Sequence, residues 1–450
     1  MKRLEQIRRR GQILPLFAIF LGFLLGFAAL AFDIGYAMVV RTQLMAALDA
    51  ATLASIRYAP QGAAAMEAAA QRTFAANLPA GKLMISNPTV TTPALTEEQG
   101  ALRVALSASA DIPMFFARWF RADGMTIRAN SAAARRDRNI ILVLDYSASV
   151  GPVLGDIKDA AKAFVNSFSD QYDQVGLVVF STSGAIAYPP QRPFKADLTG
   201  VINGVQQELF TNHAIGLYYA YRAMAELNDP LKDLKMNEIV LFTDGRANWF
   251  PGRFNVRTGS GRCNTSPAEG VFGITGRSYY NNRILSLQAS AMPNAPALSP
   301  DCSGLATGTN PVLSINPSWI PPSSPTAGAI FPEGVSLLGF KNNSTTILNK
   351  SNPSTTEREQ IAANVTDSLA RLIRKDPMGI RLHAIGYEGT ETLEMDVLER
   401  IANCQDCTRV DAADAADTTQ AKGRLVMAQT QQELLQAFLD IAGFIGRITD

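Results

Sequence analysis

The sequence predicts an α/β protein in two parts. The first part is a long transmembrane helix with a small α+β module, and the second is a doubly wound parallel sheet that carries a large insertion. Three observations predict this: twenty uncharged residues near the amino terminus, strands that alternate with helices from residue 137 onward, and two apolar strands that each end in an aspartate. With 450 residues, 47% of them hydrophobic, the chain is long enough for several cores.

A basic segment, residues 1–12, opens the chain and is expected to be cytoplasmic. Five of its first ten residues are basic and one is acidic. The apolar stretch of residues 13–32 would form a helix about 30 Å long, enough to cross a bilayer. Because no convincing cleavage site follows, we expect a retained membrane helix, with a cleaved signal as the alternative. The positive-inside rule then predicts a single-pass inner-membrane protein whose bulk is periplasmic.

The helix is expected to continue to residue 59 as one rod. Residues 33–59 are good helix formers without proline. Apolar residues recur there at spacings of three and four, namely Val40, Leu44, Ala47, Leu48, Ala51 and Ala54. Asp33, Arg41 and Asp49 interrupt this pattern. Half of the rod is therefore expected to lie in a membrane and half to pack on protein.

A specific pattern, D-x-G-x(5)-R-x-x-L-x-x-A-x-D-A-A-x-L-A, begins at Asp33 and ends at Ala54. Together with the basic and apolar residues before it, from residue 8 to about 57, it resembles the TadG-like and TadE-like proteins of the Tad (Flp) pilus system. The resemblance implies a pilin-like helix, with other pilins or pilus-assembly proteins as partners. Family pseudopilins are cut after a Gly followed five residues later by Glu, whereas Gly11 is followed there by Leu16.

Residues 60–136 are expected to form the small α+β module, which would be pilin-like. Alternating β-type runs, "MISNPTVTT", "ALRVALSASADI" and "MTIRANSAAA", predict strands, and "PMFFARWF" predicts a short helix.

Residues 137–450 are expected to form the doubly wound sheet. Strand and helix patterns follow one another as "NIILVLD", "VLGDIKDAAKAFVNSF", "QVGLVVFS", "TGVINGVQQEL", "AIGLYYAYRAMAEL", "NEIVLFTDG", "REQIAANVTDSLARLIRK", "IRLHAIGYEG" and "QELLQAFLDIAGFIGRI".

Oxygen-bearing side chains lie where two of these strands end. Asp145, Ser147 and Ser149 follow "NIILVL", Asp244 follows "EIVLFT", and Thr211 precedes a helix. The carboxyl ends of parallel strands meet at one edge of a sheet, so these groups are expected to lie together. Carboxylate and hydroxyl oxygens suit a hard divalent cation, Mg²⁺ or another such as Mn²⁺ or Ca²⁺.

The order DxSxS, then Thr, then Asp resembles the von Willebrand factor A domain with its metal-ion-dependent adhesion site. The resemblance covers residues 138–447 and implies a bound cation that accepts an acidic group of a protein or surface ligand. The chain departs from the family at Leu209 and Phe210, where two glycines often precede the Thr. The alternative is an A domain that binds no metal or uses these residues as strand caps.

Composition argues against two other classes of protein. Outside the first ten residues, clustered Lys and Arg are missing, so no nucleic acid is expected as a partner. We also expect no enzyme, because the chain has two histidines and no nucleophile with a base beside it. His213 is expected to start a helix rather than to act as a ligand or base.

The insertion is predicted at about residues 249–353. Residues 251–353 contain twelve of the 24 prolines, and so long a stretch is not an ordinary connection. Its aromatic residues are expected to form a core of their own, or else a contact surface or lid; they are Trp249, Phe250, Phe254, Phe272, Tyr279, Tyr280 and Trp319.

The four cysteines fit an oxidising compartment. Cys263 and Cys302 could close a loop within the insertion, a bridge worth about 4 kcal/mol, and Cys404 and Cys407 form a close pair. A zinc site of all four and free or redox thiols are the alternatives, and the sequence leaves the pairing open.

Two kinds of function follow. The favoured one is a Tad pilus-associated adhesion protein, a minor pilin or tip adhesin, that would be extracellular once in the pilus. The other is an uncleaved, membrane-anchored periplasmic factor for pilus assembly or secretion, with the A domain as a protein-interaction scaffold.

Overall fold

The chain divides into two units, residues 1–135 and residues 136–450, and each is described by itself. The computed structural model describes residues 13–447 except 80, 99–100, 122, 230–231, 274–282, 287–296, 306–311, 316–352, 390–392, 405–406 and 408–416. The predicted basic segment and the Gly11 position lie outside the described residues.

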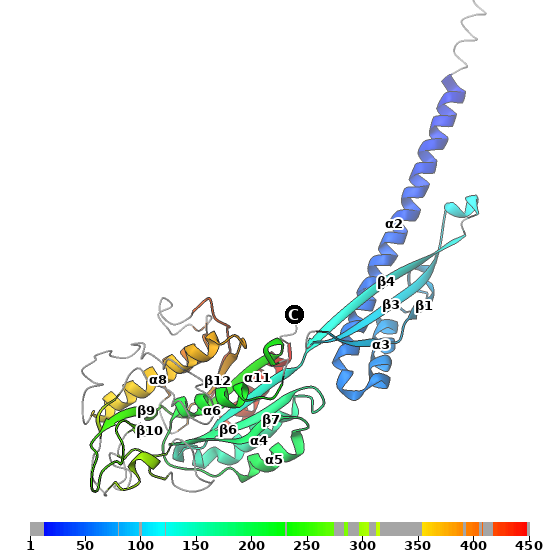
Figure 1. Cartoon of the computed structure of the whole chain (residues 1–450). Coiled ribbons are helices and arrows are strands. Elements are labelled where there is room, and N and C mark those ends of the chain that lie inside the picture. Colours follow the sequence, from blue (N-terminus) through cyan, green and yellow to red (C-terminus); the bar gives the residue numbers. More distant parts are fainter. Residues whose placement is uncertain are drawn as a thin grey trace, which may run out of the picture. The chain divides into compact units, whose positions relative to one another are not determined.

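The first unit is organised around one long helix, α2 (Ile13–Arg57), which confirms the predicted rod (Figure 1). The buried face of its second half contains the residues expected from their spacing, Val40, Leu44, Ala47, Leu48 and Ala51. They pack against α3 (Ala63–Asn77) and the sheet that follows. Within the described residues, α2 is the one helix long and apolar enough to cross a membrane.

A four-stranded sheet completes this unit. Strand β3 (Ala101–Pro113) pairs with β1 (Ser86–Val90), β2 (Ala94–Glu98) and β4 (Gly124–Arg136). Alternate residues of β3 are buried, because one face of a strand in such a sheet packs on a core. A short 3-10 turn, η2 (Lys82–Met84), precedes β1. Another such turn, η3 (Ala117–Phe120), lies in the connection between β3 and β4.

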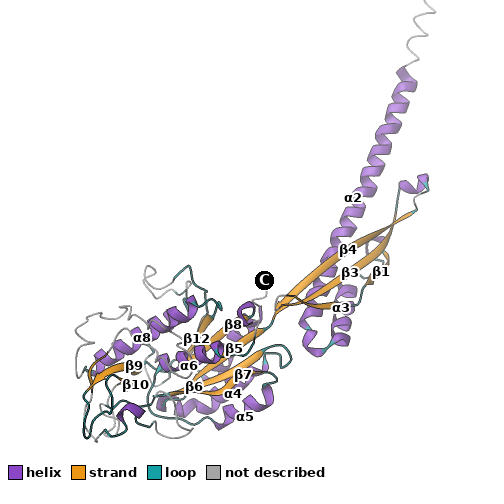
Figure 2. Ribbon diagram, in the orientation of Figure 1, coloured by secondary structure: helices purple, strands orange, loops and turns teal. Residues whose placement is uncertain are grey.

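The second unit contains a six-stranded sheet in the order β13-β12-β8-β5-β6-β7, coloured orange in Figure 2. The strands are β5 (Arg138–Asp145), β6 (Gln174–Phe180), β7 (Gly184–Gln191), β8 (Met236–Thr243), β12 (Arg381–Tyr387) and β13 (Leu425–Ala428). All neighbouring pairs are parallel except β6 and β7. The predicted doubly wound sheet is confirmed, with an antiparallel edge strand that the sequence did not reveal.

Helices cover both faces of this sheet. One face packs on α4 (Leu154–Asn166), α5 (Lys195–Gly204) and α11 (Gln431–Arg447), the other on α6 (His213–Ala225), α8 (Thr355–Lys375) and α9 (Met395–Ile401). Strand β5 contributes Leu142 to the first layer and Val143 to the second. Its unbroken apolar run is therefore explained by burial on both sides.

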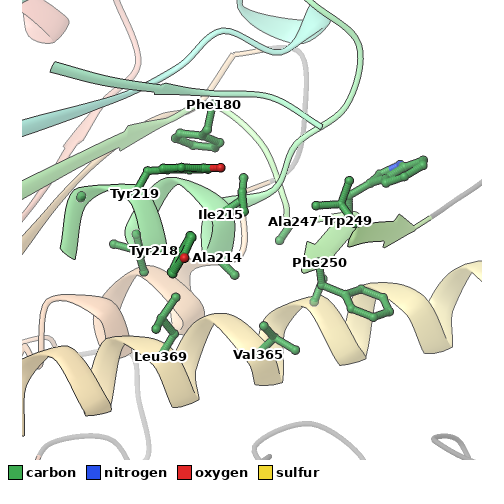
Figure 3. Packing of buried hydrophobic residues seen from close by; sticks show 14 of the residues in the cluster. Phe180, Ala214, Ile215, Tyr218, Tyr219, Ala247, Trp249, Phe250, Val365 and Leu369 are labelled. Atoms are coloured by element: carbon green, nitrogen blue, oxygen red, sulfur yellow. The ribbon is translucent and has the colours of Figure 1, made fainter. Parts of the chain in front are cut away.

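The described residues between Asp244 and α8 form a second, three-stranded sheet, in which β9 (Trp249–Val256) pairs antiparallel with β10 (Ala268–Gly273) and β11 (Val312–Ile315). Trp249, Phe250, Phe254 and Phe272 are buried in the same layer as α6 and α8. Figure 3 shows Phe250 beside Val365 of α8. The expectation of a separate core was wrong, because these rings complete the core of the main domain.

Three of the aromatic residues named with them, Tyr279, Tyr280 and Trp319, lie outside the described residues. That residues 249–353 are an insertion stays a prediction.

Both cysteine pairs are disulfides, which confirms that prediction. Cys263 is bonded to Cys302, and Cys404 is bonded to Cys407. Cys302 is the last residue of a 3-10 turn, η6 (Pro300–Cys302), which follows β10 in the chain. A zinc site of four thiolates is thereby excluded, and none of the four cysteines is free. In the chain-entropy model the longer bridge stabilises the fold by about 4 kcal/mol.

Candidate metal centre

The two aspartates of the predicted site lie at one edge of the main sheet. Asp145 is the last residue of β5, and Asp244 directly follows β8. These strands are parallel neighbours, with Leu144 opposite Phe242. Parallel strands end at the same edge, so the fold alone brings the two carboxylates together. Both side chains are buried.

Hydroxyl groups connect the two aspartates. The Ser149 hydroxyl donates to Oδ1 of Asp244 at 2.7 Å and lies 3.0 Å from the Ser147 hydroxyl. The Ser147 backbone N–H donates to Oδ1 of Asp145 at 2.9 Å. Four of the five predicted residues thus form one connected polar cluster.

The fifth residue, Thr211, is placed by its backbone. Its N–H donates to the side-chain oxygen of Asn248 at 2.9 Å, and its carbonyl accepts from the N–H groups of Asn248 and Trp249. This ties the loop before α6 to the loop after Asp244. Among the described contacts, the Thr211 hydroxyl is not hydrogen-bonded to the other four residues.

The loop that carries Leu209 and Phe210 has a defined path without the family's glycines. Leu209 accepts from the Ala148 N–H at 3.3 Å, and the Phe210 ring stacks on Trp249 at 5.3 Å between centroids. One residue earlier, the Glu208 N–H donates to the Tyr146 carbonyl at 2.7 Å. The loop is therefore fastened to the segment that contains Ser147.

Burial and like charge act on the acidic groups. Burial, together with the nearby Asp244 carboxylate, raises the pKa of Asp145 to about 7, against the hydrogen bonds from Thr243 and Ser147. Burial likewise raises the pKa of Glu208, whose carboxylate accepts from the hydroxyls of Ser181 and Tyr146. A cation at this edge would offset the repulsion between Asp145 and Asp244.

Thr243 is a site residue that the sequence analysis missed. Its hydroxyl donates to Oδ2 of Asp145 at 2.6 Å and lies 3.0 Å from Nε2 of His213. With Asp145 ionised, the single hydroxyl proton points to the carboxylate, so His213 donates to Thr243. In the sequence, the only feature that connects Thr243 with the site is its position directly before Asp244.

His213 is the first residue of α6, as expected, and is buried. Burial lowers its pKa to about 4, so its ring is neutral at physiological pH. It therefore holds Thr243 in place and adds no charge to the site.

The donor set fits a hard divalent cation better than zinc. Among the described residues there is no group of three or more His, Cys, Asp or Glu side chains that could hold a metal ion. The cluster instead offers two carboxylates and neutral hydroxyl oxygens. Such all-oxygen sets are typical of Mg²⁺, Mn²⁺ and Ca²⁺ sites.

The order of these residues and their place in the fold agree with one family. Residues 140–246 match the family model of the von Willebrand factor type A domain. Residues 11–71 match a second model, Flp pilus-assembly TadE/G-like. Both resemblances drawn from the sequence are confirmed over these residues, and the second supports association with a pilus. No curated protein matches the chain.

Solved structures resemble the chain only distantly. The PilB minor pilin from Streptococcus sanguinis is 14% identical, with 81% of this chain and 79% of that chain covered and a TM-score of 0.36. The vWF domain of the type V pili tip protein Mfa5 from Porphyromonas gingivalis is 16% identical, with 70% and 96% covered and a TM-score of 0.38. Proximal thread matrix protein 1 from the mussel byssus, with a zinc-occupied MIDAS motif, is 14% identical, with 69% and 46% covered and a TM-score of 0.33.

Proposed function

We propose that this chain is a membrane-inserted, pilus-associated protein, a minor pilin or tip adhesin, whose A domain binds an acidic group of a partner or surface ligand through a divalent cation. The observation that supports this most is the hydroxyl chain from Asp244 through Ser149 to Ser147, with Asp145 beside it. The TadE/G-like match and the exposed apolar helix support the pilus and membrane parts of the proposal.

At such a site, the residues of the A domain would supply two kinds of oxygen ligand. Asp145 and Asp244 supply negative charge, while Ser147, Ser149 and Thr211 supply neutral oxygens. A bound Mg²⁺, or Mn²⁺ or Ca²⁺ in its place, would supply a positively charged centre with an open coordination position. If only one of the two aspartates contacts the ion directly, the neutral hydroxyl ligands leave the ion a net positive charge, so its attraction for a carboxylate of the partner would be retained.

We infer binding rather than catalysis at this site. The nearest candidate base, His213, is buried and holds Thr243. A general base must reach the proton it removes in a bound substrate, and a buried ring with this partner is poorly placed for that.

The test of the proposed mechanism is adhesion or partner binding with and without divalent ions. We expect binding by the full-length protein to require Mg²⁺ and to be lost in EDTA, then restored when Mg²⁺ is added back. Binding that is unchanged in EDTA would contradict the proposal, whatever the partner.

A second candidate is a membrane-anchored factor that acts in pilus assembly from the periplasm. It is favoured by Leu16, which stands where cleaved pseudopilins have Glu, so the chain would stay uncleaved after Gly11. Shearing pili from cells separates the two candidates. A minor pilin or tip adhesin is expected in the sheared filaments, and an assembly factor only in the membrane fraction.

A further inference from the structure

The connection between β3 and β4 is fastened to the long helix by a buried aspartate. Asp33 of α2 is 1% exposed, and its carboxylate accepts hydrogen bonds from the backbone N–H groups of Phe115, Phe116 and Ala117 at 3.0, 3.1 and 2.8 Å. Residues 114–121 are called the hairpin tip from here on. Three donors on one carboxylate fix the tip at one level of the helix.

Aromatic contacts strengthen the same attachment. The Phe32 ring lies edge-on to Phe115 and Phe116 at 5.5 and 5.7 Å, and Tyr36 lies edge-on to Phe115 at 5.1 Å. The Tyr36 hydroxyl also donates to the Leu83 carbonyl, which brings the η2 turn to the same level. Figure 1 shows β3 and β4 running beside the long helix α2.

The attachment coincides with the end of the apolar stretch of α2. Leu16, Phe17 and Phe27 are more than 60% exposed, and Phe32 is 55% exposed. The next residue, Asp33, is covered by the hairpin tip. If residues 13–32 span the hydrocarbon core, the tip lies where the helix enters the outer headgroup region.

The exposed side chains of the tip suit that region. Trp119 is 78% exposed and Phe116 is 38% exposed, and in the η2 turn Met84 is 62% exposed. Arg118 and Arg121 are exposed beside them. Tryptophan with apolar neighbours and arginine is the composition of interfacial anchors, since the rings enter the headgroup layer and the cations are attracted to a negatively charged bilayer surface.

We propose that the hairpin tip and the η2 turn form an interfacial anchor that lies in the headgroup region of the bilayer. This inference rests on the proposed membrane insertion of α2. The anchor would fix how deeply the helix sits and limit its rotation, because Asp33 couples tip and helix. A tip that packs on a second copy of the chain is the alternative outcome of the test.

The experiment uses the full-length protein in vesicles of phosphatidylcholine and phosphatidylglycerol whose acyl chains are brominated near the headgroup. Tryptophan fluorescence is compared between wild type and Trp119→Phe, so that the difference reports Trp119 alone. We expect the bromolipid to quench this difference signal. A Trp119 signal that is not quenched, including one shifted to the blue by contact with another copy, would overturn the inference.

Flotation of the same vesicles separates this test from that of the proposed function. Protein that fails to float with the vesicles overturns the membrane insertion of α2 and the anchor with it. Protein that floats but shows no quenching of Trp119 overturns the anchor alone.

A charge variant tests the headgroup contact without touching the core. In Arg118→Gln/Arg121→Gln, we expect Trp119 quenching to fall in vesicles with phosphatidylglycerol and to match wild type in phosphatidylcholine alone, because each arginine near an anionic surface favours the bound tip about five-fold. Arg103→Gln is the matched control, since Arg103 is exposed elsewhere on β3. If Trp119 quenching fell equally in the double variant and in Arg103→Gln, the result would contradict a local contact between the tip and the headgroups.

Discussion

Among the buried aspartates of the molecule, Asp33 in the first unit and Asp145 in the second have charges with different surroundings. Asp33 receives three backbone N–H groups, so its charge is balanced within the protein. Asp145 receives a backbone N–H and a threonine hydroxyl but lies near a second carboxylate. The difference teaches that burial alone does not mark a binding site. A buried carboxylate with a like-charged neighbour is the one that a cation can stabilise.

The largest expected effect is on the cation. Asp145→Ala should lower the affinity for Mg²⁺ by more than about 100-fold, since even groups that only orient ligands are worth 10–100-fold. Circular dichroism and calorimetric titration of the full-length protein check folding and affinity together. Asp33→Ala is the matched variant at the other aspartate, and an equal loss of affinity there would break the comparison.

Next is the attachment of the hairpin tip. Asp33→Ala leaves three backbone donors without their acceptor, which should cost about 1–3 kcal/mol of local stability. Hydrogen exchange at Phe115, Phe116 and Ala117 should be about 5- to 150-fold faster, the factor that corresponds to this loss of local stability. Asp49→Ala, an exposed aspartate of the same helix, should leave these amides unchanged. Unchanged exchange in Asp33→Ala would show that the aromatic contacts suffice.

A smaller effect is expected from the residue that positions Asp145. Thr243→Val keeps the shape of the side chain and removes the hydroxyl that donates to Oδ2. We expect Mg²⁺ affinity to fall about ten-fold, since Thr243 orients a ligand without providing one. An affinity equal to that of wild type would mean that Ser147 alone holds the carboxylate.

The smallest effect is a dependence of stability on pH. A carboxyl group has a pKa of about 4 in the unfolded chain, whereas burial raises the pKa of Asp145 to about 7 in the fold. Between these values the folded state binds more protons than the unfolded state, so stability without cations should fall as pH rises from about 4 to 7. Urea titrations check this. Asp145→Asn should reduce the slope, whereas Asp33→Asn should not.

Mg²⁺ should also reduce that slope, because a cation displaces the proton from the carboxyl group. The same slope with and without Mg²⁺ would contradict this assignment of the pKa.

The residues at the carboxyl edge of the main sheet could be predicted from the sequence, because the patterns that indicate them lie within short segments of the chain. The apolar run before Asp145 predicts a strand buried on both sides, and parallel strands carry their ends to one edge. Ser147, Ser149 and Asp244 could therefore be placed together from the order of strands and helices. The strand β7 was missed because it contains Pro189 and Pro190, which argue against a strand, although proline is tolerated at a sheet edge.

Tertiary contacts explain what the sequence could not reveal. Asp33 was expected to interrupt an apolar surface, but its partners lie more than 80 residues away in the hairpin tip. The aromatic residues from Trp249 to Phe272 were expected to form their own core, because the pattern of a segment does not show which helices it meets. Thr243 gains its role only through the neighbouring strand that ends in Asp145.

The claim that the cluster around Asp145 binds a divalent cation is tested most directly by calorimetric titration of the full-length, detergent-solubilised protein with Mg²⁺, Mn²⁺ and Ca²⁺. We predict binding of one ion per chain in the wild type and an affinity more than about 100-fold weaker in Asp145→Ala, with Asp33→Asn behaving as wild type. No binding at millimolar concentrations of any of the three ions, or equal binding in Asp145→Ala, would contradict it.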